Sequence, residues 1–298
     1  MKEQKSVENY TNNYLTNVIF RIDFPKIQEF DSINPPTVLK ERINGKFPVM
    51  EKVVTKSVQV ELIDKIGTTK HEERFSWKFM DQNNKKIFLI DQEFISFECL
   101  DYENFDSFVK DVKLVLGNFM GLYPLDLVKR LGLRYINQIN GEKGNPLDWS
   151  DLINQNLFSI PMNFITQSDS ILRYMTNLEI EEEQYLLRFN FGLFNSEFPN
   201  PLARKEFVLD YDCYIEAEIE ISEIYQRVEE CNKIIYSWFE RSIEDELRIK
   251  MREKNDKKKS KKKEDEKPTE DIKDFKISTD KYQKSRMERK IIKYEIKN

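Results

Sequence analysis

Two short segments near the start of the chain recur in its second half at almost the same spacing. Residues 18–24 read VIFRIDF and residues 131–137 read LGLRYIN, with their arginines 113 positions apart. Residues 74–79 (RFSWKF) and 188–193 (RFNFGL) match at a spacing of 114. Because a duplicated domain places equivalent strands at a constant spacing, the pattern predicts one structural unit that is present twice.

Each half shows the same order of patterns: one strand, a connection, three strands and a long helix. The strands alternate apolar and polar residues, and the helices, over residues 105–120 and 221–239, have apolar residues three and four apart. We therefore predict an α+β fold of two pseudo-repeated units of antiparallel strands, each followed by a long amphipathic helix. The units are residues 14–125 and 126–251, after a flexible N-terminus over residues 1–13. The helices should cover one sheet face and leave an Arg- and Asp-rich face on the other.

The charge of the chain is divided unevenly along its length. Residues 251–298 carry 18 Lys and Arg against 11 Asp and Glu, a net charge of +7, which leaves −12 for residues 1–250. We predict a charged linker over residues 252–270 and a basic C-terminal segment over residues 271–298. The lysine run at residues 257–263 favours a nucleic-acid partner, whereas its flanking acids and its lack of aromatic residues favour a solvated linker.

Composition is typical of a soluble cytoplasmic protein. The first residues show no apolar signal region, and no apolar run approaches the roughly 20 residues that cross a bilayer. Cys99, Cys213 and Cys231 are widely spaced, which fits reduced thiols better than a disulfide framework. The single histidine, His71, falls in a predicted polar loop, and no glycine-rich phosphate loop is present. We therefore predict no membrane contact, no metal and no cofactor.

Five arginines stand on the polar side of the alternation inside predicted strands. A solvent-facing sheet would pair them with acids across neighbouring strands, which contributes less than about 1 kcal/mol per pair. A recognition face would instead present their planar guanidinium groups to carboxylates, phosphates or a peptide. The candidate binding residues are these arginines and two acids of the last strand: Arg21, Arg74, Arg134, Arg173, Arg188, Asp210 and Asp212.

Acidic residues also alternate along the last predicted strand and its continuation. Asp210, Asp212 and Glu216 share one face with Glu218 and Glu220. Paired carboxylates hold Mg²⁺ or Mn²⁺ in enzymes of phosphoryl chemistry, so a metal-dependent nuclease or phosphotransferase is an alternative function. A solvated sheet face explains the same pattern without any activity.

Several segments are similar to those of a known family. They are residues 14–24, 47–48, 77–79, 94–96, 130–137 and 238–248. Over about residues 14–251 the chain resembles the sporadically distributed prokaryotic protein family of unknown function, and the LGLRYIN block is the most specific part. Patchy occurrence implies gene transfer and fits genome-defence or mobile-element neighbourhoods. The resemblance implies no active site.

The patterns together predict a non-enzymatic, cytosolic recognition or adaptor protein, and the resemblance implies a role as a subunit of a prokaryotic defence system. We expect a protein partner that binds the Arg- and Asp-rich sheet face or the basic extension. Nucleic-acid binding through residues 252–298 is a second alternative, beside the metal-dependent enzyme. The oligomeric state is left open.

Overall fold

The structure is a computed structural model of the chain. It describes residues 10–30, 33–63, 66–141, 144–164 and 171–253, with the backbone alone over residues 57–72, 161–162 and 164. The chain divides into two units, residues 1–254 and 255–298, and the described residues all belong to the first. Within them, no helix has both the length and the apolar character needed to cross a bilayer.

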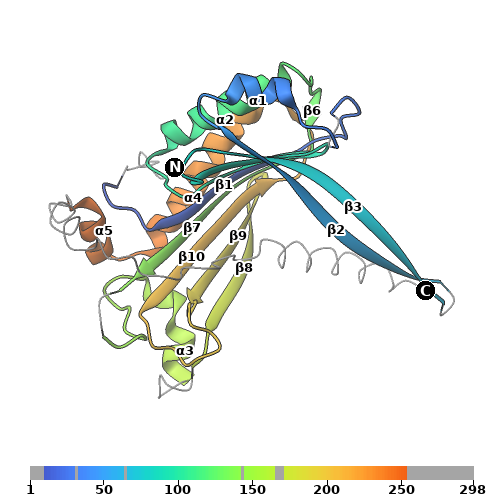
Figure 1. The fold of residues 1–298 in the computed structure, drawn as a ribbon. Coiled ribbons are helices and arrows are strands. Elements are labelled where there is room, and N and C mark those ends of the chain that lie inside the picture. The colour runs from blue at the N-terminus through green and yellow to red at the C-terminus, as the bar shows by residue number, and fades with distance from the viewer. Residues whose placement is uncertain (1–9, 31–32, 64–65, 142–143, 165–170, 254–298) are drawn as a thin grey trace, which may run out of the picture. The chain divides into compact units, whose positions relative to one another are not determined.

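The described residues are built on one nine-stranded sheet whose neighbours are all antiparallel (Figure 1). The strand order is β2-β3-β4-β5-β1-β7-β10-β9-β8. The strands are β1 Leu15–Asp23, β2 Val49–Ile63, β3 Ile66–Met80, β4 Lys86–Ile90, β5 Phe94–Cys99, β7 Arg130–Asn140, β8 Tyr174–Glu182, β9 Tyr185–Leu193 and β10 Glu206–Ile215. A separate pair of short strands consists of β6 Leu127–Val128 and β11 Ile219–Glu220.

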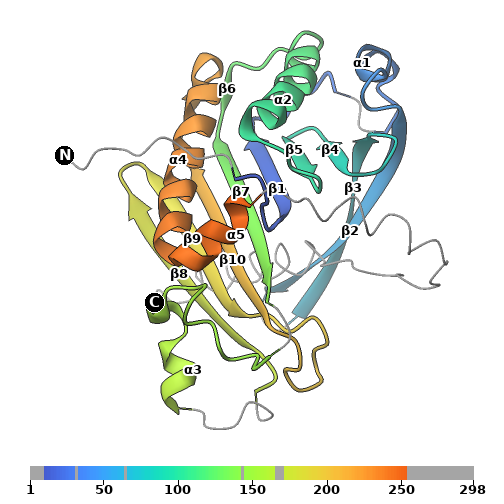
Figure 2. The same cartoon turned by 90° about the vertical axis from the view of Figure 1, so that its left-hand side faces the viewer.

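The longest helices lie together on one face of the sheet (Figure 2). They are α2 Phe105–Met120 and α4 Ile224–Ser242, accompanied by α1 Thr37–Ile43 and α5 Asp245–Arg252. The short α3 Ser159–Phe164 and the 3-10 turns Gln155–Leu157 and Ile221–Glu223 complete the helical elements of the described residues. α4 packs on β7 and β10, and α1 packs on α2. We call the opposite face, where α1, α2 and α4 do not lie, the helix-free face.

The prediction of two pseudo-repeated α+β units is wrong, because the strands of both halves join in one sheet. β1 and β7, which begin the two halves, are neighbours at its centre. The internal match also compares strands in different places. β3, with Arg74, is separated from β1 by two strands, whereas β9, with Arg188, is separated from β7 by β10 alone. The first half contains one strand more than predicted, since residues 87–99 form β4 and β5 around a turn at Asp91.

The helix prediction for residues 105–120 is confirmed by α2. Its first turn is capped by Asn104, whose side chain accepts a hydrogen bond from the backbone N–H of Ser107 (2.9 Å). The second predicted helix, residues 221–239, consists of a 3-10 turn followed by α4. Apolar residues at helical spacing therefore located both long helices.

The predicted loop around His71 is instead part of a long hairpin. β2 and β3 pair along their whole length, and His71 of β3 stands opposite Val58 of β2. β3 meets β4 only from Trp77 to Met80, so most of the hairpin is a two-stranded ribbon beyond the rest of the sheet. The sequence around His71 is polar throughout. A polar run favours a loop as much as a strand, so this part of the hairpin was predicted as a loop.

The core lies between the sheet and the helices. Val18, Phe20 and Ile22 of β1 are buried, while the alternate residues of the strand point to the helix-free face. In the first half, Phe88 and Phe97 stack with their ring centres 4.2 Å apart. β1 and β5 follow the alternation seen in the sequence, whereas nine of the ten residues of β10 are buried. Phenylalanine rings fill much of the layer between the sheet and the helices.

The two ends of the described chain lie side by side. The backbone N–H of Asn12 donates to the carbonyl of Met251 (2.9 Å), and its side-chain amide donates to the carbonyl of Glu253 (2.6 Å). The Tyr10 hydroxyl also donates to the carboxylate of Glu240. These bonds tie the entry of β1 to the end of α5.

Gly192 of β9 is predicted to tolerate no side chain. Its φ is +144°, and an added Cβ would lie 2.1 Å from the carbonyl oxygen of Tyr174 on β8. We expect Gly192→Ala to lower the free energy of unfolding by about 2–4 kcal/mol, measured by urea denaturation. Gly117→Ala is the matched control. It lies in α2 with open space around the new methyl group, so it should stabilise the protein by about 0.5–1 kcal/mol. Equal effects of the two substitutions would contradict the geometry.

Candidate functional site

The helix-free face carries a row of alternating charge across four neighbouring strands. The register places Arg134 of β7 beside Asp212 of β10, Asp212 beside Arg188 of β9, and Arg188 beside Glu179 of β8. These positions alternate with buried residues such as Tyr211, whose side chains lie in the core. The structure therefore brings Arg134, Arg188 and Asp212 together, although their strands are far apart in the sequence.

A bidentate ion pair joins β7 to β10 beside this row. Nε and Nη2 of Arg134 donate to the two carboxylate oxygens of Asp210, both at 2.7 Å. The side chain of Asp210 is 8% exposed and that of Arg134 is 24% exposed. Asn190 donates to the same carboxylate (3.2 Å) and accepts from Asn177 (2.5 Å), so the network crosses four strands. Two parallel hydrogen bonds of this kind fix the orientation of both side chains.

Tyr214 lies between two arginines on the same face. Its ring centre is 4.7 Å from the guanidinium carbon of Arg130 and 6.0 Å from that of Arg188. Arg188 contacts Glu179 at 3.0 Å. Burial lowers the pKa of Arg188, but its bond with Glu179 and the charges of its neighbours outweigh burial, so the pKa is raised. This arginine therefore stays charged over the whole physiological range.

Two further candidate arginines meet at Phe94. The guanidinium carbons of Arg21 and Arg74 lie 4.0 Å and 5.6 Å from its ring centre. Arg21 donates through Nε to Asp23 (2.6 Å), and Arg74 donates through Nε to the buried carboxylate of Asp91 (2.6 Å). Burial lowers the pKa of Arg74, but its acidic partners raise it above its ordinary value.

Gly132 connects these two clusters. It stands opposite Arg21 of β1 on one side and opposite Tyr214 of β10 on the other. A Cβ at this position would lie 3.1 Å from Nη1 of Arg130, so the absence of a side chain leaves room for that guanidinium group. Six of the seven candidate residues thus belong to one continuous polar face.

Arg173 does not belong to this face. The sequence places it inside a strand, but β8 begins at Tyr174, and Arg173 lies just before it. Its Nε donates to the carbonyl of Phe194 (2.8 Å), and its guanidinium carbon lies 4.2 Å from the ring centre of Phe198. Arg173 therefore supports the loop at the end of β9.

The structure describes the acids of the metal-dependent alternative, but not most of the segment proposed to bind nucleic acid. Asp210 is bound by Arg134, and Asp212 and Glu216 lie 4.0 Å and 3.7 Å from Arg130. A metal ion at these acids would therefore meet the positive charge of both arginines. Across the described residues, no group of three or more His, Cys, Asp and Glu side chains is placed to hold a metal ion. The proposed nucleic-acid segment, residues 252–298, lies outside the described residues from residue 254 onward.

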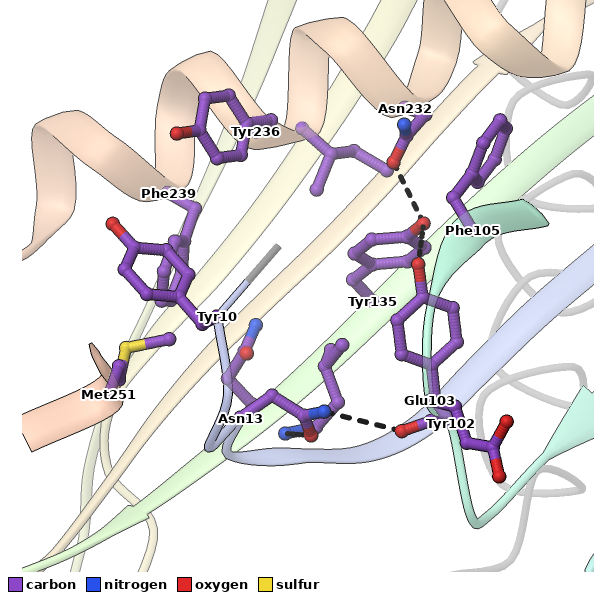
Figure 3. Close-up of a pocket in the computed structure, with 13 residues that line it drawn as sticks. Tyr10, Asn13, Tyr102, Glu103, Phe105, Tyr135, Asn232, Tyr236, Phe239 and Met251 are labelled. Atoms are coloured by element: carbon purple, nitrogen blue, oxygen red, sulfur yellow. Dashed lines mark hydrogen bonds between the residues drawn. The ribbon is translucent and has the colours of Figure 1, made fainter. Parts of the chain in front are cut away.

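A pocket on the helix-covered face was not predicted from the sequence. Figure 3 shows Tyr10, Phe239 and Met251 on one side of it, and Tyr102 and Tyr135 on the other. The start of the described chain, β7, α4 and α5 all contribute to its wall, and its cavity volume is about 80 Å³. That volume is small compared with the several hundred Å³ of most sites for drug-sized ligands.

A chain of hydrogen bonds crosses one wall of this pocket. The hydroxyl of Tyr135 donates to Oδ1 of Asn232 (2.8 Å), and the hydroxyl of Tyr102 lies 3.3 Å from that of Tyr135. Burial raises the pKa of Tyr102 to about 12 and raises the pKa of Tyr135 well above its ordinary value. Both hydroxyl groups are therefore neutral at physiological pH and act as hydrogen-bond groups.

One sequence signal pointed to this pocket and was missed. Asn137 stands on the apolar side of the alternation of β7, and Asn232 stands among the apolar positions of α4. A polar residue at a buried position needs a hydrogen-bond partner, so such positions mark polar sites inside a core. The tyrosines gave no signal, because a tyrosine in an apolar series is usual.

The pair of Arg134 and Asp210 provides a test of the network. Arg134→Met leaves a buried carboxylate without its partner, so we expect the free energy of unfolding to fall by about 2–4 kcal/mol in urea denaturation. The double variant Arg134→Met with Asp210→Leu removes both charges and should recover at least about half of that loss. A double variant as unstable as the sum of the two single variants would show that the pair is not coupled.

The hydroxyl chain in the pocket provides a second test. Tyr135→Phe leaves Oδ1 of Asn232 without this donor, so we expect a loss of about 1–3 kcal/mol in the free energy of unfolding. Tyr102→Phe is the matched control. It keeps the bond between Tyr135 and Asn232 and should cost less than about 1.5 kcal/mol. A larger loss in Tyr102→Phe than in Tyr135→Phe would contradict the assigned direction of the bonds.

No protein-family model matches the chain, and no curated protein matches it.

Proposed function

We propose that the protein is a non-enzymatic recognition or adaptor protein that binds a protein partner through the helix-free face of β7, β10, β9 and β8. The supporting observation is the row formed by Arg134, Asp212, Arg188 and Glu179, which alternates in charge across four adjacent strands. A fixed pattern of alternating charge gives specificity to a protein interface, because a partner with the wrong pattern places like charges together.

The pairing of the arginines favours a protein over a free anion. Arg134 already binds Asp210, Arg188 binds Glu179, and Arg21 binds Asp23. A phosphate or carboxylate ligand would therefore have to displace an acid of the protein from each guanidinium group. A partner surface with both signs of charge can instead add contacts at the edges of these pairs without breaking them.

The same face also has apolar and aromatic groups suited to an interface. Leu186 of β9 and Met175 of β8 are 39% and 40% exposed, and both point to the helix-free face by the alternation of their strands. Tyr214 lies between Arg130 and Arg188. Tyrosine and arginine are enriched among the residues that contribute most to protein–protein binding.

The proposed role in prokaryotic defence rests on the sequence resemblance alone. It requires the partner to be another component of such a system. A partner of any other class would leave the recognition function in place and remove the defence role.

Purification of the tagged full-length chain at low salt from its natural host, with and without nuclease, tests the proposal. Native mass spectrometry then identifies what stays bound. We expect a protein partner that survives nuclease and whose recovery falls at least about tenfold in the double variant Arg188→Ala with Leu186→Ser, because both residues lie on the proposed interface. Val38→Ser is the matched control, since Val38 is 49% exposed on α1 and lies on the other side of the sheet.

Each other result has a defined meaning. Equal recovery in the interface variant and in the control would refute binding through the helix-free face. Nucleic acid that is lost with nuclease and on deletion of residues 254–298 would establish the second alternative. If neither binds, calorimetry with Mg²⁺ and Mn²⁺ on the wild type and on Asp210→Asn decides the metal-dependent alternative.

A further inference from the structure

β8 forms one of the two edges of the sheet. Its residues pair with β9 on one side, and no described strand lies on the other. Of the described backbone groups outside the ladders, none bonds to the main chain of residues 174–182. The outward N–H and C=O groups of an edge strand are a template for pairing with a further strand.

This edge lacks proline and lysine, two features that often prevent such pairing. β8 is nine residues long and contains no proline, lysine or arginine. Leu178, at its centre, is 41% exposed, and Met175 is 40% exposed. The opposite edge, β2, has the usual protection, because it carries Lys52 and Lys56. The two edges therefore differ in how strongly their sequences oppose pairing.

We propose that β8 pairs in antiparallel register with β8 of a second copy of this chain, giving a dimer whose two sheets are continuous. Pairing of the strand along its full length, Tyr174 to Glu182 against Glu182 to Tyr174, places Leu178 of one copy directly opposite Leu178 of the other. This register buries the two exposed leucines against each other at the two-fold axis.

The charges of β8 select this arrangement. Its acids stand only in the second half of the strand, at Glu179, Glu181 and Glu182, and its first half, residues 174–177, is uncharged. In the proposed register the acids therefore face Asn177, Met175 and Tyr174, respectively, of the second copy. Parallel pairing in register would place each glutamate opposite its own copy, which is unfavourable. A slip toward the C-terminal half would bring Glu179 opposite Glu179. Antiparallel pairing about Leu178 avoids both.

Contacts within the chain reduce the protection that the acids give this edge. Glu179 contacts Arg188 of the neighbouring strand at 3.0 Å, and Glu182 accepts a hydrogen bond from Nε1 of Trp238 on α4 (2.8 Å). Both carboxylates are directed by contacts within their own chain. The free edge therefore carries less unpaired negative charge than its sequence indicates.

The test measures the mass of the purified full-length chain by light scattering and by sedimentation over a range of concentrations. We expect a dimer, twice 35.9 kDa, for the wild type. Leu178→Lys should weaken the dimer at least about 100-fold, because the two-fold axis places two lysines opposite each other.

Val54→Lys is the matched control. Val54 is 47% exposed on the other edge strand, and its substitution should leave the dimer unchanged. Circular dichroism and thermal melting establish that both variants remain folded.

Cysteine cross-linking tests the register. Leu178→Cys should form a disulfide between two chains under mild oxidation, because directly opposed residues of antiparallel strands have Cα atoms about 4.5–5.5 Å apart. Met175→Cys is the control, since its counterpart in the second copy is Glu181, and it should not cross-link. The native cysteines are all buried, which keeps them from competing.

The outcomes separate this inference from the proposed function. A monomer at all concentrations, or a dimer that persists in Leu178→Lys, overturns the pairing of β8. A dimer lost in Val54→Lys and kept in Leu178→Lys would assign the interface to β2 instead. The measurement uses the purified chain without any partner, so its failure leaves the recognition function to its own test.

Discussion

The pairing of β1 with β7 is the interaction on which the rest of the structure depends. It joins the first and second halves of the chain along eight register pairs, from Leu15 opposite Asn137 to Asp23 opposite Arg130. The other seven strands of the large sheet extend outward from these two, and α2 and α4 share one core over this continuous sheet. Bringing residues so far apart in the sequence together costs conformational entropy. Burial of the apolar face of the sheet against the apolar faces of the helices offsets that cost.

The same continuity creates the polar face. A sheet with helices on one side must leave its other side to polar residues or to a partner. Here the arginines are held by acids from neighbouring strands, most closely in the pair of Arg134 with Asp210. Half-buried ion pairs fix the side chains of this face at little net gain in stability. The ion pairs therefore cost the fold little stability and hold the charged side chains in fixed positions.

Much of the local structure was predictable from the sequence, because it depends on alternation and helical spacing alone. The buried face of β1 and the position of α2 followed from those patterns. The strand order could not be predicted in this way. A repeat spacing near 113 shows which segments are alike, but not which strands pair in the sheet. The split of residues 87–99 into β4 and β5 was missed because the polar turn between them, residues 91–93, is only three residues long and has apolar residues on both sides. Arg21 and Arg188 were chosen as candidate residues from the alternation of their strands, but their partners depend on the sheet register. The pocket around Tyr135 depends on contacts between distant segments.

The hydrogen bond between Asn12 and Met251 has a consequence for how the protein can be handled. The described chain begins and ends at one place on its surface, on the helix-covered side of the sheet. Once residues 1–9 and 254–298 are removed, a short connection would join residues 10–253 into a closed loop of structure. Such a module can be inserted into a surface loop of another protein, or reopened at the β3–β4 turn, while every ladder of the sheet stays intact. The helix-free face would then stay clear of the attachment point.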